Sequence, residues 1–524
     1  ALILYVAGAV HEAVYLTTET ALYNACHTPH FCILYKRNEI LGDPDVGNDG
    51  WSRSGGGVIA DMTWLKSRFP DVLVPGYSPK HPSWIQDLGY YLECAFNTYS
   101  ADGFKFHAVR NPALPLPAAY FVVKVDSFLV AKMTEAKGAF DAIRDRLAFN
   151  RKFLKTIPRM KAASAHELFH AAQHWSFGIS EMMILQKRFS WWLEACAEYA
   201  SCRVAWNFDT MGSKEDLPSP PFVNPQLLQE CLPSTGDTSG GKYAETEYDK
   251  SYLVEYLVSQ GGITFPDLHA GMVRETLSIG LDPVMGLVNL FRRETGDSSH
   301  FAGLYQSFAR RLLFGSRSPM GCATFPGAET DRVLTVRFKT DAAASPKLEH
   351  TFRLPGPFSA RVAAILPDMD REAAARRHRI RVKVRDVTPG TLVEAHLLPG
   401  NRPVSEDGAP DHVFPAAGGT FACDLAAADG LYVLAVNPSP SAGQTQATLE
   451  VDAFELVAIP ESIQDPTGKR VQQFRAVAYN LPPALSNPWF RWIFPDAVDP
   501  LEFCCRPPFK SAVTSQLLHS FATD

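Results

Sequence analysis

The spacing of apolar and polar residues along the chain changes character near residue 330. Before this point, apolar residues recur at helical spacing in the stretches 83–99, 161–201 and 248–313. Side chains spaced in this way lie on one face of a helix, so each stretch predicts amphipathic helical structure. The second stretch is interrupted near 177–180, which predicts two helices there.

Two short runs before the second helical stretch have the character of strands. Residues 120–125 read YFVVKV, a run rich in β-branched and aromatic residues, and 146–152 (RLAFNRK) form a shorter second run. Such residues favour the half-buried surface of a sheet. Residues 209–246 are rich in Pro, Gly and Ser and predict a long loop.

After residue 330 the chain alternates apolar and polar residues in short segments such as 333–340, 380–387 and 430–436. Turn residues separate these segments, and this combination predicts a small antiparallel β-sandwich. The last 65 or so residues contain two Pro-rich stretches with Trp489 and Trp492, and their pattern assigns them no fold.

The sequence therefore predicts an α+β chain in four parts. Residues 1–145 form an N-terminal α/β part, and residues 146–325 complete the same unit with a mainly helical half. The β-sandwich occupies residues 330–456, and a C-terminal extension of unknown fold follows at 457–524.

Composition excludes several classes of function. The 524 residues carry a net charge of -6, so no basic surface favours nucleic acid. No apolar run reaches the 18 or so residues that a membrane span needs. Residues 1–10 are apolar and form either a first strand or the stub of a removed targeting segment. Because the chain begins with Ala, we expect processing or trimming upstream. The oligomeric state has no signal in the sequence.

Ten cysteines are spread along the chain without a CxxC pair, which argues against a zinc ribbon or a dense disulfide framework. Cys26 and Cys32 are close enough in sequence to form a short-loop disulfide. For Cys196 and Cys202, small buried thiols are an equally good account.

The segment AHELFHAA, residues 165–172, carries the main chemical signal. His166 and His170 are four residues apart, so both imidazoles lie on one helix face at a separation that suits two ligands of a tetrahedral zinc. Glu167 projects beside such a metal and can take a proton from a bound water. The alternative is that this short motif occurs by chance and that its histidines pack in the helix without binding a metal.

A third ligand comes from FSWWLEACAEYA, residues 189–200. Glu194 and Glu198 are again four residues apart among apolar residues, and two buried acids would be costly without a cation or donors. Zinc bound by Glu194 removes the cost for one acid. Glu198 can accept the outer N–H of a ligand histidine. The alternative is that one or both glutamates are solvated.

HELFH followed by WWLEACAEY resembles the gluzincin clan of zinc metallopeptidases, in which a glutamate of a downstream helix is the third ligand. The second segment is similar to the WLNEGFAEY type of aminopeptidase N relatives, with Leu193 in place of Asn. The layout also resembles bacterial secreted zincins that have an HELFHxxQ helix and a following β-sandwich. The resemblance implies a zincin-like catalytic unit, a peptide or protein substrate and a secreted location.

The resemblance also suggests a group that stabilises the oxyanion. The segment 248–251 is similar to the YxKG segment of these enzymes, so Tyr248 is the candidate, with Tyr252 one turn on as its rival. No GxMEN-like segment precedes the metal helix, which favours an endopeptidase over an aminopeptidase. His174, one turn beyond His170, is too far along the helix to join the same tetrahedron and is interpreted as packing or as a partner of a ligand.

Two weaker signals concern substrate and calcium. Either strand run, 120–125 or 146–152, could be the sheet edge that pairs with an extended peptide, and a buried strand accounts equally well for both. Residues 42–50 (GDPDVGNDG) alternate acids with Gly and could bind Ca2+, with a plain turn as the alternative.

For the whole chain, two alternative functions stay open. One is an inactive zincin-like binding or structural protein, and the other is a zinc hydrolase of a non-peptide bond.

Overall fold

The structure is a computed structural model that describes part of the chain. The described residues are 23–28, 30–36, 83–106, 121–126, 138–141, 146–150, 157–177, 190–206, 250–279, 282–314, 332–338, 348–371, 373–401, 409–440, 443–453, 455–464, 470–479, 490–493, 502–505 and 514–519.

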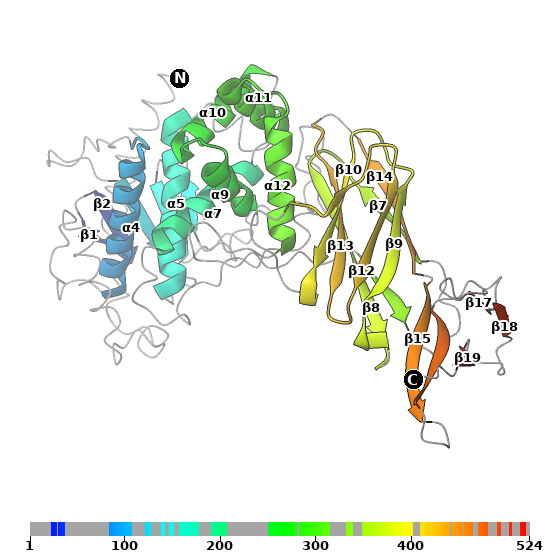
Figure 1. Cartoon of the computed structure of the whole chain (residues 1–524). Coiled ribbons are helices and arrows are strands. Elements are labelled where there is room, and N and C mark those ends of the chain that lie inside the picture. The colour runs from blue at the N-terminus through cyan, green and yellow to red at the C-terminus, as the bar shows by residue number, and fades with distance from the viewer. Residues whose placement is uncertain are drawn as a thin grey trace. The chain divides into compact units, whose positions relative to one another are not determined.

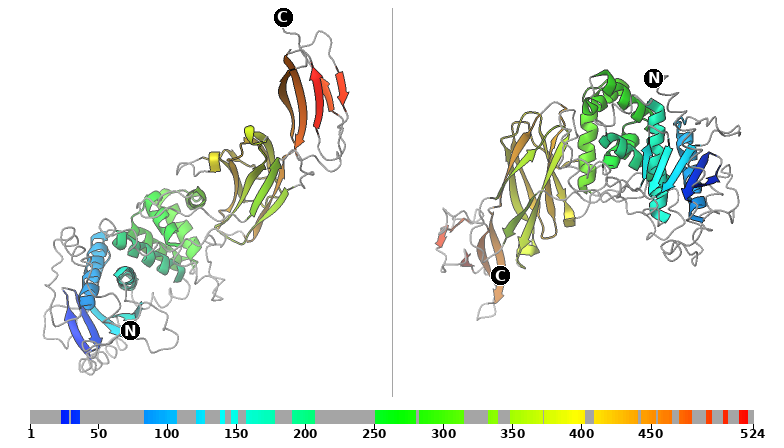
Figure 2. Two further views of the ribbon diagram at one scale, coloured as in Figure 1. Left: turned by 90° about the horizontal axis from the view of Figure 1, so that it is seen from below. Right: turned by 180° about the vertical axis from the view of Figure 1, so that it is seen from behind.

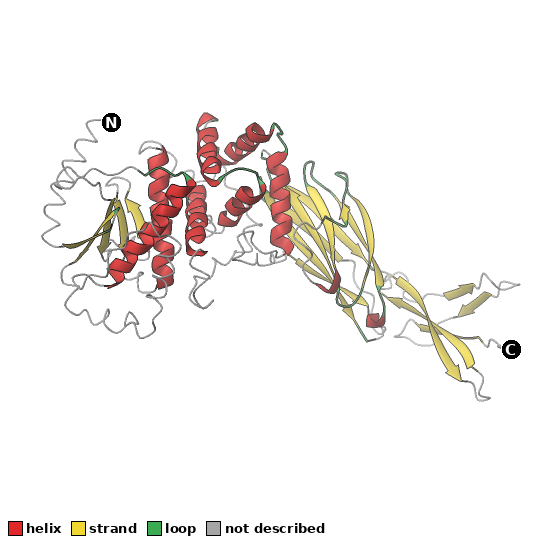
Figure 3. Ribbon diagram, turned by 60° about the vertical axis from the view of Figure 1, so that its left-hand side comes forward, coloured by secondary structure: helices red, strands yellow, loops and turns green. Residues whose placement is uncertain are grey.

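The chain divides into two compact units. Unit 1 comprises Ala1–Leu227, Pro233–Leu304 and Arg317–Ala323, and unit 2 comprises Leu228–Leu232, Tyr305–Ser316 and Thr324–Asp524. Helices make up most of unit 1 and strands most of unit 2, so the predicted α+β class is confirmed (Figures 1 and 3). The predicted boundaries between four parts stay predictions.

Unit 1 contains a five-stranded mixed sheet with the order β1-β2-β3-β5-β4. The inner pairs β2–β3 and β3–β5 are parallel, and the outer pairs are antiparallel. Helices α4 and α5 pack on one face of this sheet (Figure 2, right). The strands are β1 (Tyr23–His27), β2 (Phe31–Lys36), β3 (Phe121–Asp126), β4 (Gly138–Asp141) and β5 (Arg146–Asn150).

Both strand runs named as edge candidates form strands, but neither lies at an edge of the sheet. β3 is flanked by β2 and β5, and β5 is flanked by β3 and β4. Neighbours on both sides use the backbone hydrogen-bonding groups that an added peptide strand would need. The prediction of an edge strand at 120–125 or 146–152 is therefore wrong. The edges of the described sheet are β1 and β4.

The helical stretches predicted before residue 330 are confirmed. Residues 83–99 lie in α4, and the stretch 161–201 is divided between two helices, α5 and α7, as its interruption predicts. No helix in the described segments is both long enough and apolar enough to cross a bilayer. The helices are α4 (Ser83–Asp102), α5 (Ile157–Phe177), α7 (Ser190–Trp206), α9 (Ser251–Gln260), α10 (Phe265–Ser278), α11 (Pro283–Thr295) and α12 (His300–Phe314).

Local sequence sets several of these helix ends. Thr264 begins α10 and its hydroxyl accepts a hydrogen bond from the Asp267 amide, while Asp282 caps two amides at the start of α11. Both helices have a proline in their first turn, where a missing N–H costs nothing. Gly296 ends α11 in the left-handed conformation with φ 75°, which a residue without Cβ adopts readily.

Unit 2 contains the predicted β-sandwich. One sheet has the order β11-β10-β13-β8-β6 and the other β12-β9-β14-β7, and all pairs are antiparallel except β6–β8. The inner faces form one apolar core. The strands are β6 (Arg332–Phe338), β7 (Leu348–Leu354), β8 (Ser359–Met369), β9 (His378–Arg385), β10 (Leu392–Leu398), β11 (His412–Val413), β12 (Gly419–Leu425), β13 (Gly430–Asn437) and β14 (Thr445–Asp452).

The C-terminal extension, to which the sequence assigns no fold, also contains strands. They form a three-stranded sheet of order β15-β16-β19 and a hairpin of β17 and β18. These strands are β15 (Glu455–Gln464), β16 (Arg470–Tyr479), β17 (Phe490–Ile493), β18 (Glu502–Cys505) and β19 (Thr514–His519).

The short-loop disulfide expected between Cys26 and Cys32 is absent, and both are free, buried thiols. In the β1–β2 hairpin Cys26 lies opposite Ile33, while Cys32 lies opposite His27. Side chains of successive strand residues point to opposite faces, so the two sulfurs project from different faces of the hairpin. Burial raises the pKa of each thiol to about 11. Cys196 is also a buried free thiol, whereas Cys202 is only partly buried.

Candidate metal centre

Helix α5 carries the two histidines on a segment that is otherwise packed into unit 1. The apolar residues around the motif have no exposed surface, whereas His170 is only half-buried. The hydroxyl of Tyr99 in α4 donates to the Ala165 carbonyl at 2.9 Å, next to His166. Packing thus fixes the helix and leaves one face for polar chemistry. The fully buried residues are Ala165, Leu168, Phe169, Ala171 and Ala172.

Helix α7 faces α5 and supplies the acids. Between residues 191 and 201 all side chains are buried except Glu194 and Glu198, which are about one-quarter and one-fifth exposed. Ser201 donates one interhelical hydrogen bond, to the Ala162 carbonyl of α5 at 3.0 Å. The glutamates are therefore held at the α5–α7 boundary and are not freely solvated.

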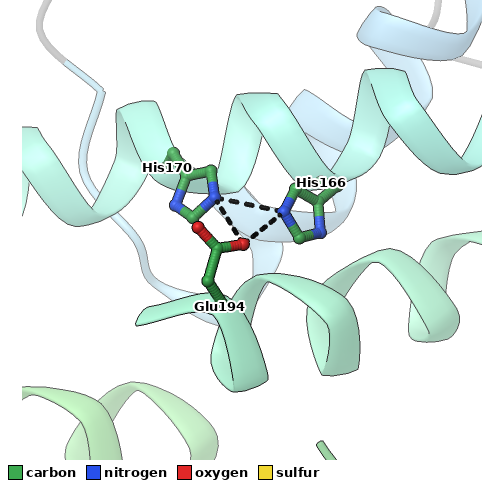
Figure 4. Close-up of side chains that lie close together, drawn as sticks. All are labelled: His166, His170 and Glu194. Atoms are coloured by element: carbon green, nitrogen blue, oxygen red, sulfur yellow. Dashed lines mark hydrogen bonds and ion pairs between the residues drawn. The ribbon is translucent and has the colours of Figure 1, made fainter. Parts of the chain in front are cut away.

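His166, His170 and Glu194 converge on one point (Figure 4). The Nε2 atoms of His166 and His170 are 3.1 Å apart. Oε2 of Glu194 lies 3.0 Å from the first nitrogen and 3.4 Å from the second. A tetrahedral ion with bonds of about 2.0–2.1 Å separates its ligand atoms by about 3.3 Å. The three distances fit this requirement, so the cluster could hold a metal ion.

Each imidazole also has a partner at its Nδ1 atom. Nδ1 of His166 lies 3.3 Å from Oε2 of Glu198, and Nδ1 of His170 lies 2.8 Å from Oε1 of Gln173. Such partners orient ligand histidines and fix which ring nitrogen carries the proton. The sequence pattern suggests the first contact but gives Gln173 no role. Its sequence signals are the three-residue spacing from His170 and its match to the Gln of the HELFHxxQ pattern.

The cluster strongly shifts the charge states of its members. Burial opposes protonation of His166 and His170, but the neighbouring carboxylates outweigh it and raise the pKa of both imidazoles. Burial likewise opposes ionisation of Glu194, but His170 and His166 outweigh it and hold the pKa of Glu194 far below its usual range. A positive charge is therefore favoured at this point, as protons or as a metal ion.

Glu167 lies beside the cluster and is itself buried. Its negative charge contributes to the raised pKa of both histidines, which places its carboxylate within electrostatic reach of them. It is not one of the three convergent groups. Glu167 therefore lies near the point where the three ligand atoms meet without contributing one of them.

Several other predicted residues lie apart from the cluster or outside the described part of the chain. His174 is buried and is not one of the convergent groups. Tyr252 is buried in the first turn of α9, a helix that packs against α7. Tyr248 and residues 42–50 lie outside the described residues, so the oxyanion and calcium assignments stay predictions.

Helix α10 contacts α7 through a buried hydrogen bond that the sequence does not predict. The Nε1–H group of Trp192 donates to Nδ1 of His269 at 3.2 Å, and both residues are buried. Burial, reinforced by the nearby His170, lowers the pKa of His269 to about 3, so its ring is neutral and accepts this bond. Phe169 of α5 stacks on Phe265 of α10 with centroids 5.2 Å apart. Helices α5 and α7 thus share one aromatic support in α10.

No protein-family model matches the sequence, and a search of curated proteins finds no match either.

Proposed function

We propose that the protein is a zinc metallopeptidase in which His166, His170 and Glu194 bind the metal. The observation that carries this proposal is the convergence of three ligand atoms at 3.0–3.4 Å, with Glu167 beside them. Two imidazole nitrogens and one carboxylate suit zinc, whereas Mg2+ and Ca2+ prefer sites made of oxygen ligands.

The proposed reaction is hydrolysis of a peptide bond. Zinc bound at this cluster would supply a Lewis acid and lower the pKa of a bound water to about 7. Glu167 takes a proton from the attacking water and passes it to the leaving amine. The carboxylate of Glu198 orients His166 by its contact with the Nδ1 atom of that imidazole. We assign the stabilisation of the oxyanion to Tyr248, with Tyr252 as its rival.

The wider proposal follows from the same motifs. We propose a zincin-like catalytic unit that is secreted and acts within peptide chains, since the sequence has no GxMEN-like segment to hold a free amino end. The β-sandwich then serves as an accessory module for attachment to substrate or to a surface.

Cleavage of a mixed peptide library by the zinc-loaded chain tests this function. We expect wild-type protein to cleave internal bonds. Glu167→Gln should retain zinc and lose about 10²–10⁴-fold in turnover, the usual contribution of a general base. Glu294→Gln, a change at an exposed glutamate of α11, is the matched control and should cleave normally.

Two outcomes would contradict the proposal. Normal turnover by Glu167→Gln would remove the proposed general base. A wild-type chain that binds zinc but leaves every peptide intact would favour a binding protein or a hydrolase of another bond. A panel of ester and non-peptide amide substrates would separate those two alternatives.

A further inference from the structure

Gln173 is a fully buried amide between the two helices that form the metal centre. Its Oε1 atom lies 2.8 Å from Nδ1 of His170, and its Nε2 atom donates to the backbone carbonyl of Leu193 at 3.0 Å. Leu193 directly precedes Glu194 on α7. One side chain therefore contacts a histidine of α5 and the backbone next to the acid of α7.

The donors and acceptors of Leu193, Gln173 and His170 allow one arrangement of hydrogen bonds. A backbone carbonyl only accepts hydrogen bonds, so the NH2 end of Gln173 must face Leu193. The amide oxygen then faces His170 and requires a donor, so Nδ1 of His170 carries the proton. The Nε2 atom of His170 is left with its lone pair, and this atom faces His166 and Glu194.

We infer that Gln173 is a positioning residue of the metal centre, which sets the tautomer of His170 and ties it to the backbone beside Glu194. This inference rests on the proposed metal site. A hydrogen bond to the ring nitrogen that does not bind the metal orients a ligand histidine. Loss of such a bond weakens metal binding by about 10–100-fold.

The same geometry explains why an amide is needed where His166 has a carboxylate. Glu198 faces the N–H side of an imidazole, and an acceptor is sufficient for this contact. Gln173 must accept from His170 and also donate to Leu193, and a carboxylate would place an unfavourable acceptor against the Leu193 carbonyl. Gln173→Glu would therefore keep one of the two contacts and lose the other.

Zinc affinity of folded variants tests the role of Gln173. Gln173→Met keeps the side-chain length but removes both hydrogen bonds, and we expect about 10–100-fold weaker Zn2+ binding in competition with a chromophoric chelator. Gln173→Glu should recover part of this loss, because it still accepts from His170. In Gln173→Met, the visible spectrum of bound Co2+ should also change as the ring reorients.

Ser201→Ala is the matched control, since it removes another α7–α5 hydrogen bond without touching a ligand. It should bind Zn2+ as tightly as wild type. Equal Zn2+ affinity in folded Gln173→Met and wild-type protein would overturn the inference, as would equal weakening by Ser201→Ala.

A measurement without metal separates this inference from the proposed function. Nitrogen-15 spectra of metal-free protein, at a pH above the pKa of His170, report which ring nitrogen carries the proton, and His170→Ala identifies the signal. We expect the proton on Nδ1 in wild type and a shift toward Nε2 in Gln173→Met. A wild-type proton on Nε2 would overturn the inference, whether or not zinc binds.

Discussion

At the scale of single residues, the candidate metal centre brings together groups that repel one another unless a cation joins them. With protons on both Nδ1 atoms, the Nε2 lone pairs of His166 and His170 face the Glu194 carboxylate at 3.0–3.4 Å. In the absence of metal, protons on the imidazoles fill this role, and the carboxylates raise the pKa of both rings accordingly. Metal and protons therefore compete for the same lone pairs.

This competition predicts that zinc affinity falls as the pH is lowered. Because the pKa of both histidines is raised above 6.5, protons already oppose the metal near neutral pH, and the opposition fades as pH rises through the raised values. Up to about two protons should be released per Zn2+ bound. Dissociation constants measured between pH 6 and 9 test this, and a pH-independent affinity would contradict it.

At this scale, the sequence predicts the site residues whose types and positions form a recognisable motif. His166 and His170 lie together as their spacing predicts, and Glu194 joins them from the second helix, as expected for a buried acid that needs a cation. Glu198 contacts His166, also as expected. Gln173 matches the Gln of the HELFHxxQ pattern, but its contacts are not predicted, because its partner Leu193 offers a backbone carbonyl that no sequence pattern marks. A hydrogen bond of this kind depends on how α5 and α7 pack.

At the scale of elements, the periodicity of apolar residues predicts the helices well but says little about their neighbours. The segments 83–99 and 161–201 fold into α4, α5 and α7 as their spacing predicts. The run 120–125 is a strand as predicted, yet its central place in the sheet depends on parallel partners that are distant in sequence. Strand propensity contains no information on that pairing.

The support of α7 by α10 is open to a mutational test. His269→Leu leaves the buried Nε1–H of Trp192 without its acceptor, which should lower the free energy of unfolding by about 1–3 kcal/mol. Adding Trp192→Phe removes the donor as well, so the double variant should lose less than the sum of the single losses. Urea unfolding measures this coupling, and strictly additive losses would show that the contact contributes nothing.

At the scale of the whole molecule, unit 2 keeps a buried acid outside its apolar core. Glu394 of β10 is fully buried and forms an ion pair with Arg310 of α12, and Gln306 also donates to it. Burial opposes its ionisation, but Arg310 and His396 outweigh burial and lower the pKa of Glu394 to about 2. The segment of α12 from residue 305 thus belongs to the fold of this unit.

Loss of the Arg310 guanidinium should destabilise unit 2 strongly. Arg310→Met leaves a buried carboxylate without its main partner, which should cost on the order of 3 kcal/mol at neutral pH. Because the folded pKa lies below the usual 4.5, the ion pair stabilises above that value. Its contribution is lost as pH falls toward about 2. Calorimetric unfolding of the full chain should show a deficit that shrinks on acidification, and a constant deficit would contradict this origin.

The metal content of purified protein tests the central claim most directly. We expect about one zinc per wild-type chain, and loss of that zinc in His166→Ala, which removes one of three protein ligands. Ser201→Ala, which loses an interhelical hydrogen bond but no ligand, should retain its zinc. A folded wild-type protein that carries no zinc and takes up none when it is added would contradict the account.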